Sequence, residues 1–237
     1  MATAELRPAV IGAIQSVGLG RLYHNFWWDR WSRRRSPFTA WSREHNVVFV
    51  HIPKNAGTSL YRTFGMDIPD NTHCPVVGYL AADAQAFLNA YSFAFVRNPW
   101  DRLVSAFHYL KQEPISDDDK RWARQALGRF DTFGEFMKAM ERPVFRHRVV
   151  GWRHFKPQWH YLTDWAGRSA VSYLGRFETL GDDVEAIGRA IGITPELRRE
   201  NSTRRLPYQR YYTPESRERA ARIYAEDIAR YGYRWDD

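Results

Sequence analysis

A single lysine stands in a loop of small residues that follows an apolar run. Residues 53–59 read PKNAGTS, and they come directly after the β-branched segment 47–52. A strand that ends in a tight turn and a helix start would point the backbone N–H groups of this loop at one place, where the helix dipole also favours negative charge. The loop therefore predicts an anion-binding cradle. Its expected members are Lys54, Asn55, Ala56, Gly57, Thr58 and Ser59.

The position of the lysine argues against a magnesium-dependent phosphotransferase. In the nucleotide-hydrolase P-loop the lysine follows the last glycine, and the metal-binding hydroxyl follows the lysine. In this chain Lys54 precedes Gly57. The histidine, cysteine and acidic residues also lack convincing metal-ligand spacing, so no metal is expected.

A second segment indicates which anion the cradle would hold. The apolar stretch 92–96 reads as a buried strand, and Arg97 follows it at the point where ligands bind in open α/β sheets. A guanidinium there offers a planar fork for phosphate. Pro99 suits the first turn of a helix, and Ser105 lies about two helical turns further on. Ser105 reaches the same ligand only if this helix passes the ligand edge-on.

The two segments resemble the motifs of the sulfotransferases that use 3′-phosphoadenosine 5′-phosphosulfate (PAPS), in particular the carbohydrate sulfotransferase branch. That branch has a Pro-Lys-x-x-Gly-Thr-Ser loop for the 5′-phosphosulfate and an Arg-Asn-Pro-x-x-Arg-x-x-Ser motif for the 3′-phosphate, and both are present here in full. The resemblance continues through 154–158, 176–183 and 201–203 to 224–233, so it covers roughly residues 45–237. The commoner loop has Thr-Gly where this chain has Asn55-Ala56.

The resemblance implies PAPS as donor, a hydroxyl of a saccharide or glycoconjugate as acceptor, and in-line transfer of the sulfuryl group. Such a transfer depends on positioning, charge stabilisation and one general base. Lys54 is the candidate for the departing phosphate oxygen. His73, between the two motifs, is the favoured base, because related proteins place a histidine there and a neutral imidazole suits this role. His154, in a His-x-x-Pro-Gln setting, is the rival and otherwise an acceptor-binding residue.

A third segment, 201–205, is expected to close over the nucleotide, because family members use a loop near this position. Ser202, Arg204 and Arg205 are its candidate cofactor ligands, although a solvated basic turn before Pro207 is an equal alternative. Glu178 and Asp183 are expected to be structural, as partners of arginines or as helix caps.

The elements around these motifs alternate between strand and helix, which predicts an α/β fold with a central parallel sheet flanked by helices, like that of P-loop nucleotide hydrolases. Further helices are expected at 79–90, 99–112, 121–127, from 131 onward, 180–191 and 214–231, and a strand at 171–177. The 237 residues suffice for one sizeable core. Residues 46–237 are expected to form the sulfotransferase domain.

Residues 1–45 are expected to form an N-terminal arm with aromatic and basic residues. Its apolar run 10–19 is shorter than a membrane span, and no signal-peptide pattern is recognised. Residues 26–35 mix tryptophans with arginines, so they are expected either to pack on protein or to touch an anionic membrane surface. The single cysteine fits a reducing cytosol, and the expected location is cytoplasmic, with the inner face of the membrane as an option.

Two other function classes share some of these features. A small-molecule or sugar kinase would have the sheet and the anion loop, but it should carry a lysine after the last glycine and an acidic magnesium ligand. A non-catalytic nucleic-acid-binding protein would explain the net charge of +8 and the 16% aromatic content. It would not explain two phosphate motifs at strand-to-helix junctions, so nucleic acid is not an expected partner.

Overall fold

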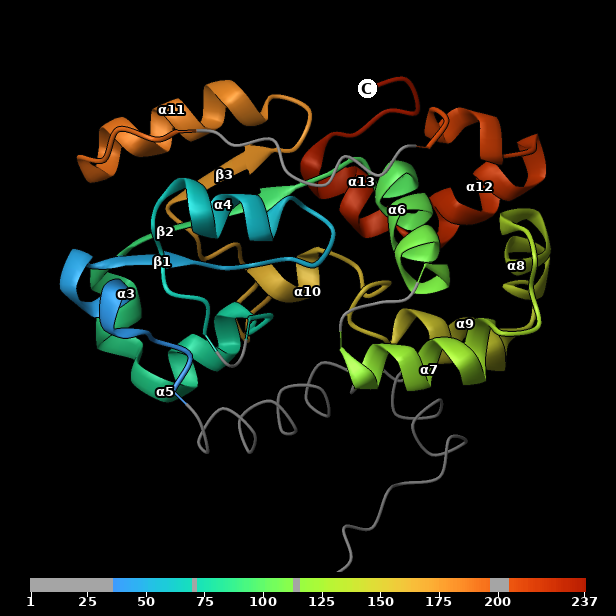
Figure 1. Cartoon of the computed structure of the whole chain (residues 1–237), viewed down its shortest axis with the longest axis horizontal. Coiled ribbons are helices and arrows are strands. Elements are labelled where there is room, and N and C mark those ends of the chain that lie inside the picture. Colours follow the sequence, from blue (N-terminus) through green and yellow to red (C-terminus); the bar gives the residue numbers. More distant parts are fainter. Residues whose placement is uncertain (1–35, 70–71, 113–115, 197–204) are drawn as a thin grey trace, which may run out of the picture.

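A three-stranded parallel sheet lies at the centre of one half of the molecule (Figure 1). The computed structural model describes residues 36–69, 72–112, 116–196 and 205–237. Strands β1 (Val47–Phe49), β2 (Tyr91–Val96) and β3 (Tyr173–Arg176) lie in the order β1-β2-β3, with Phe93 opposite both Phe49 and Tyr173. Both pairs are parallel, which confirms the predicted α/β class with a parallel sheet.

Helices cover both faces of this sheet and form a second half beside it. Their bounds are α3 Ala40–His45, α4 Gly57–Thr63, α5 Val76–Asn89, α6 Pro99–Lys111, α7 Asp117–Leu127, α8 Phe133–Ala139, α9 Pro143–Val150, α10 Trp159–Leu162, α11 Leu180–Ile191, α12 Pro214–Ile223 and α13 Ala225–Tyr231, with a 3-10 turn at Tyr208–Tyr211.

The alternation of side chains along the strands divides the core. Val47, Phe49, Phe93 and Phe95 point to one face, where they pack against α4 and α11. Their neighbours Val48, Val50, Ala94 and Val96 point to the other face, against α5 and α10. Because both faces are covered, β2 is apolar at nearly every position.

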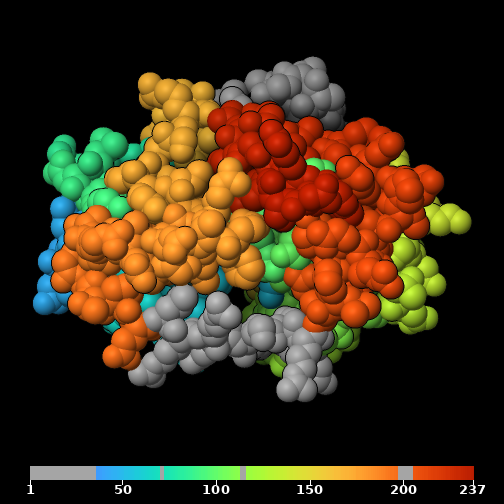
Figure 2. All heavy atoms as spheres, turned by 90° about the horizontal axis from the view of Figure 1, so that it is seen from above, coloured from blue at the N-terminus to red at the C-terminus, as the bar shows by residue number. Residues whose placement is uncertain are grey.

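The second half of the molecule is a helical cluster around α6, with α7, α8, α9 and α12 packed against it (Figure 1). Helix α6 starts directly after β2 because Asn98 caps it, accepting a hydrogen bond from the backbone N–H of Trp100 at 3.1 Å, and Pro99 fills the first turn. Seen from above, atoms of the green segment that contains α6 are visible between the orange and the red parts of the chain (Figure 2). Helix α6 therefore connects the sheet to the helical half.

One predicted helix is wrong in form. The segment 214–231 is two helices, α12 and α13, because Tyr224 leaves helical geometry at φ −108° and ψ 25°. The buried hydroxyl of Tyr224 donates to the carbonyl of Phe155 at 2.8 Å. Three residues later, Asp227 accepts a hydrogen bond from the backbone N–H of Gln158, directly before α10. A tertiary contact thus interrupts a continuous helical pattern.

Other boundaries differ by a few residues from the sequence expectation. Helix α5 begins at Val76, directly after Pro75, and it is kinked at Asp83, whose φ is −163°. Strand β3 is shorter at both ends than the predicted 171–177. The other predicted helix at 180–191 coincides with α11.

Residues 1–35 lie outside the described part of the chain, and so does the tryptophan and arginine segment 26–35. The described residues that follow pack on the sheet: Phe38 is buried with its ring 5.3 Å from that of Tyr79, and α3 lies against β1. Within the described ranges, none of the helices has the length and apolar character needed to cross a membrane.

Candidate active site

The loop between β1 and α4 has an unusual backbone. Lys54 and Ala56 both adopt the left-handed region, with φ of 73° and 61°, and Gly57 then begins α4. For residues with a side chain this conformation costs about 1 to 2 kcal/mol each, so the surrounding structure must hold it. Left-handed residues in a loop can turn successive N–H groups to one side, a geometry that binds anions. The strand, turn and helix start therefore follow one another as predicted, and anion binding by this loop stays a prediction.

Gly57 is required by a close approach. A Cβ atom at this position would lie 1.7 Å from Nε2 of His51, whose imidazole stacks on Phe49 with ring centroids 5.4 Å apart. Burial, followed by the charges of His154 and Lys54, lowers the pKa of His51 to about 3. His51 is thus a packed, neutral residue that forms the wall behind the loop.

A buried amide network joins the two predicted anion motifs. The side-chain nitrogen of Asn55 donates to the carbonyl of Phe95 at 2.6 Å and to Oε1 of Gln158 at 2.8 Å. The same Oε1 accepts the backbone N–H of Arg97 at 2.9 Å, and Nε2 of Gln158 donates to the Arg97 carbonyl at 2.8 Å. The backbone N–H of Gln158 donates to Asp227 at 2.8 Å. Asn55 thus acts through its side chain, which the sequence interpretation missed.

Replacing Gln158 by methionine should destabilise the fold. Methionine keeps the length of the side chain, but one N–H of the Asn55 amide and both backbone groups of Arg97 lose their partner in a site where Gln158 is fully buried, while the other N–H of Asn55 keeps its bond to Phe95. At 1 to 3 kcal/mol for each unsatisfied group, and without full additivity, we expect a loss of about 3 kcal/mol in the free energy of unfolding, measured by urea denaturation. Gln125→Met, on the exposed side of α7, is the control. A loss below 1 kcal/mol, on the order of one ordinary hydrogen bond, would contradict the network's importance.

Two arginines meet at one carboxylate near the start of α6. Arg97 donates to Oδ2 of Asp101 from Nε at 2.8 Å and from Nη2 at 2.6 Å, and Arg205 binds the other oxygen of Asp101. Arg97 also donates to the carbonyl of Lys54 at 3.0 Å. Ser105 is buried one turn beyond Asp101 on the same face of α6. The structure therefore brings Arg97 and Arg205 together at Asp101, and it places Ser105 one turn further along α6.

A third arginine, Arg102, which the sequence interpretation did not single out, stabilises the loop through hydrogen bonds to two carbonyls. Arg102 donates to the carbonyl of Pro53 from Nε and to the carbonyl of Lys156 from Nη1, both at 2.9 Å. The motif includes an arginine at this position, five residues after Arg97. Its structural role could not be predicted from the sequence, because the two carbonyls that it binds belong to distant segments.

Lys54 lies where these positive charges converge. Its Nζ is 4.0 Å from the centre of the Tyr109 ring, and the residue is half-buried. Burial, followed by the charges of Arg97, Arg102 and Arg205, lowers the pKa of Lys54 to about 7, while Asp119 opposes the shift. A site that crowds cations in this way favours a multiply charged anion.

His73, the predicted general base, and His154, the alternative candidate for this role, lie near each other. The ring centroid of His73 is 4.5 Å from that of His51 and 6.1 Å from that of His154. Nδ1 of His73 is 3.4 Å from the carbonyl of His51. Since a carbonyl only accepts, this long contact favours the tautomer with the proton on Nδ1 and the lone pair on Nε2. Burial, with the neighbouring imidazoles, keeps the pKa of His73 well below its ordinary value, so the ring is neutral.

Asp119 is a site residue that the sequence interpretation missed. In the sequence it is one of three aspartates at the start of a helix, but its side chain is only 3% exposed. It accepts hydrogen bonds from Nε1 of Trp152 at 3.1 Å, from Nε of Arg153 at 3.2 Å and from Nε2 of His154 at 3.0 Å, and it forms an ion pair with Arg153. Burial opposes ionisation, but the hydrogen bonds from His154 and Arg153 hold the pKa of Asp119 below its usual range. The carboxylate is therefore a fixed negative charge beside the histidines.

Several expectations about the site have a plain outcome. Thr58 is exposed at the mouth of the loop, whereas Ser59 is buried. Ser202 and Arg204 lie outside the described residues. The structural role of Glu178 is confirmed, because its carboxylate accepts from the backbone N–H of Asn98 at 2.7 Å and from the hydroxyl of Tyr233 at 3.0 Å.

Asp183 is structural as well: it accepts from the backbone N–H of Arg176 at 2.9 Å and from the hydroxyl of Tyr173 at 2.7 Å. These contacts tie α11 to the end of β3.

The ranges that the structure describes contain no group of three or more histidine, cysteine, aspartate or glutamate side chains placed to hold a metal ion.

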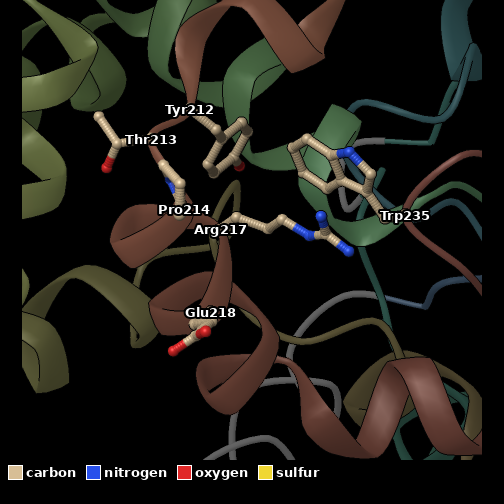
Figure 3. A pocket seen from close by; sticks show the side chains of 6 residues that line it. All are labelled: Tyr212, Thr213, Pro214, Arg217, Glu218 and Trp235. Carbon is tan, nitrogen blue, oxygen red and sulfur yellow. The ribbon is translucent and has the colours of Figure 1, made fainter.

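A hollow of about 420 Å³ lies apart from this cluster, at the start of α12. Figure 3 shows the Arg217 guanidinium extended beneath Trp235, 4.8 Å from its ring, while Glu218 points away. None of the predicted site residues that the structure describes lines it. The size of this hollow does not make it the active site, because the arginines and histidines that the motifs single out lie around Lys54.

Comparison with known proteins agrees with the geometry. The description of the sulfotransferase family matches residues 39–234, a span that contains both anion motifs, His73 and His154. Neither the comparison with curated proteins nor that with solved structures gave a match. Since the family match extends over most of the 237 residues and the loop, the arginines and the histidines meet in one place, this chain belongs to the sulfotransferase family.

Proposed function

We propose that this protein transfers the sulfuryl group of PAPS to a hydroxyl of a saccharide or glycoconjugate. The observation that carries the proposal is the convergence of Lys54, Arg97 and Arg205 with the neutral His73 in one site. When bound, PAPS supplies an activated sulfuryl group on a phosphate leaving group. Its several negative charges would offset the cations that lower the pKa of Lys54.

The residues suit the two charged ends of such a donor. The left-handed loop and Lys54 would hold the 5′-phosphosulfate. Arg97, Arg205 and Ser105 would hold the 3′-phosphate, with Ser202 and Arg204 as further candidates. A 3′-phosphate would compete with Asp101 for the two guanidiniums, which are already aimed at one point.

In the reaction that we propose, His73 acts as the general base. Its Nε2 takes the proton of the acceptor hydroxyl while that oxygen forms the new bond to sulfur, and the bond from sulfur to the phosphate oxygen breaks in line. Lys54 stabilises the negative charge that grows on the departing phosphate oxygen. His154, next to His73, would help to bind the acceptor.

The saccharide acceptor and a cytoplasmic setting belong to the same proposal. Their support is the carbohydrate-branch form of the two motifs and the single cysteine. Screening a panel of acceptors with labelled PAPS tests the acceptor class. A kinase, the main alternative, would be stabilised by ATP in a thermal-shift assay, whereas the proposed enzyme should be stabilised by PAPS and by its desulfated product PAP.

Replacing Arg205 by alanine should separate the two ends of the donor. Removing a charge-assisted contact typically costs roughly 1.5 to 3 kcal/mol, so we expect PAP to bind at least about tenfold more weakly. Adenosine 5′-phosphosulfate lacks the 3′-phosphate, so its affinity should change little. Isothermal titration measures both, with the exposed Arg210→Ala as control. Equal losses for the two ligands would contradict the assignment.

The alkaline side of the pH–rate profile should report on Lys54. Because its pKa is lowered to about 7 in the free protein, kcat/KM for the donor should decline as the pH rises through this region and Lys54 loses its proton. Bound donor adds negative charge, so the corresponding decline in kcat should occur at higher pH. Lys54→Arg, which stays charged, should abolish the decline. An unchanged alkaline limb in that variant would assign it to another group.

A further inference from the structure

His154 is held by a carboxylate from another part of the chain. Its Nε2 lies 3.0 Å from Oδ2 of Asp119, and both side chains are almost fully buried, at 6% and 3% exposure. Asp119 belongs to the first turn of α7, whereas His154 belongs to the segment between α9 and α10. Two buried groups 35 residues apart in the sequence are therefore fixed against each other.

This contact decides where His154 carries its proton. An ionised carboxylate only accepts hydrogen bonds, so Nε2 must donate and Nδ1 keeps a lone pair. The ring is neutral, because burial, which outweighs the effect of Asp119, lowers its pKa to about 4. Within the described residues this buried Nδ1 has no hydrogen-bond partner. A buried acceptor of this kind calls for a donor from water or from a bound molecule.

His154 lies next to the residues to which the proposed reaction assigns roles. The ring centroid of Tyr109 is 4.9 Å from that of His154, and Nζ of Lys54 lies over the same Tyr109 ring. The ring of His73 is 6.1 Å away. His154 thus stands beside both groups that the proposed reaction needs, the base and the cation.

We infer that Asp119 is a positioning residue, which fixes His154 as the Nε2–H tautomer so that Nδ1 accepts a hydrogen bond from a hydroxyl of the acceptor. The inference rests on the proposed function for the identity of the acceptor, but the tautomer does not depend on it. Other donors to the same carboxylate, Trp152 and Arg153, would keep Asp119 ionised and in place.

The tautomer can be measured without any substrate. In protein labelled with ¹⁵N-histidine, two-dimensional NMR distinguishes a protonated from an unprotonated ring nitrogen, and a His154→Gln spectrum assigns the signals. We expect one histidine with unprotonated Nδ1 and protonated Nε2 that keeps this form across neutral pH. In Asp119→Asn this signal should shift toward a mixture of tautomers. The opposite tautomer, or a mixture in the unaltered protein, would overturn the inference.

Kinetics then test the consequence for the acceptor. In Asp119→Asn, assayed at about pH 6 so that Lys54 stays largely protonated without the charge of Asp119, we expect KM for the acceptor to rise about five- to tenfold, the equivalent of one neutral hydrogen bond, with KM for PAPS unchanged. Asp118→Asn is the matched control, because it makes the same change of charge one residue earlier, where the side chain is 67% exposed and pairs with Arg121. An increase in both KM values, or an equal effect in the control, would show that Asp119 has only a structural or long-range electrostatic role.

The two experiments separate this inference from the proposed function. If PAPS does not bind, the proposed function fails while the tautomer result stands. If PAPS is turned over but Asp119→Asn leaves the tautomer and the acceptor KM unchanged, the positioning role fails alone.

Discussion

Lys54→Ala is expected to lower kcat by about 10² to 10³, or about 3 to 4 kcal/mol of transition-state stabilisation, as for the loss of other preorganised charge contacts. The side chain lies where three arginines already concentrate positive charge, and its ammonium is the one held over Tyr109 beside the histidines. Because the contact strengthens as negative charge grows on the departing phosphate oxygen, the larger part of the loss should appear in kcat, and loss of the ground-state contact with the 5′-phosphosulfate should add a smaller rise in KM for PAPS. Single-turnover kinetics with labelled PAPS measure it.

Two variants make this result interpretable. Lys54→Met keeps a stem against the Tyr109 ring but removes the charge, so it should lose as much activity as the alanine variant. Lys120→Ala, a partly exposed lysine of α7 paired with Asp117, should behave like the unaltered protein. Turnover near the unaltered rate in a folded Lys54→Ala protein would reject the assigned role.

His73→Ala should reduce kcat by the roughly 10² to 10⁴ usual for loss of a general base, while PAPS binds nearly as before. Since the pKa of His73 is held well below its ordinary value, its unprotonated form persists into acidic solution. The acidic limb of kcat/KM in the unaltered protein should therefore lie at a lower pH than an ordinary histidine gives. In His73→Ala this limb should disappear.

His154→Ala provides the contrast, because its effect should fall mainly on KM for the acceptor. The opposite pattern is equally measurable: the acidic limb would survive in His73→Ala and vanish in His154→Ala. That outcome would assign the base to His154 and make the segment around His73 a wall of the acceptor site.

The local motifs of this chain could be predicted because each is contiguous. A strand, a turn and a helix start follow one another around Lys54 and again around Arg97, and parallel strands bring such turns to the same edge of a sheet. The structure accordingly places Lys54, Arg97 and Arg205 together. Ser202 and Arg204 remain predictions, since they lie outside the described residues.

What the sequence did not reveal are contacts between distant segments. Asp119 stands in a run of three aspartates that all favour a helix start, and only the contact with His154 distinguishes it from the other two. In the sequence Asn55 is one of several small loop residues, and only the structure shows that its amide donates a hydrogen bond to Gln158. Tyr224 ends a helix in the middle of an amphipathic pattern, and its hydroxyl donates a hydrogen bond to the carbonyl of the distant Phe155.

The buried amide of Gln158 has a consequence for the order in which the molecule forms. It joins residues that are 103 and 61 positions away along the chain, and it is itself held by Asp227, 69 positions further on. Contacts of such large sequence separation form late, because closing long loops is entropically costly. During synthesis, the two anion motifs therefore leave the ribosome long before the residues that lock them together.

Donor affinity should consequently arise only when the last helix has docked. A nucleotide that binds this locked arrangement stabilises the complete chain over every partly folded form, by an amount that grows with the logarithm of its concentration. In a cell, the supply of donor would then influence how much of the newly made protein persists, as well as how fast it works.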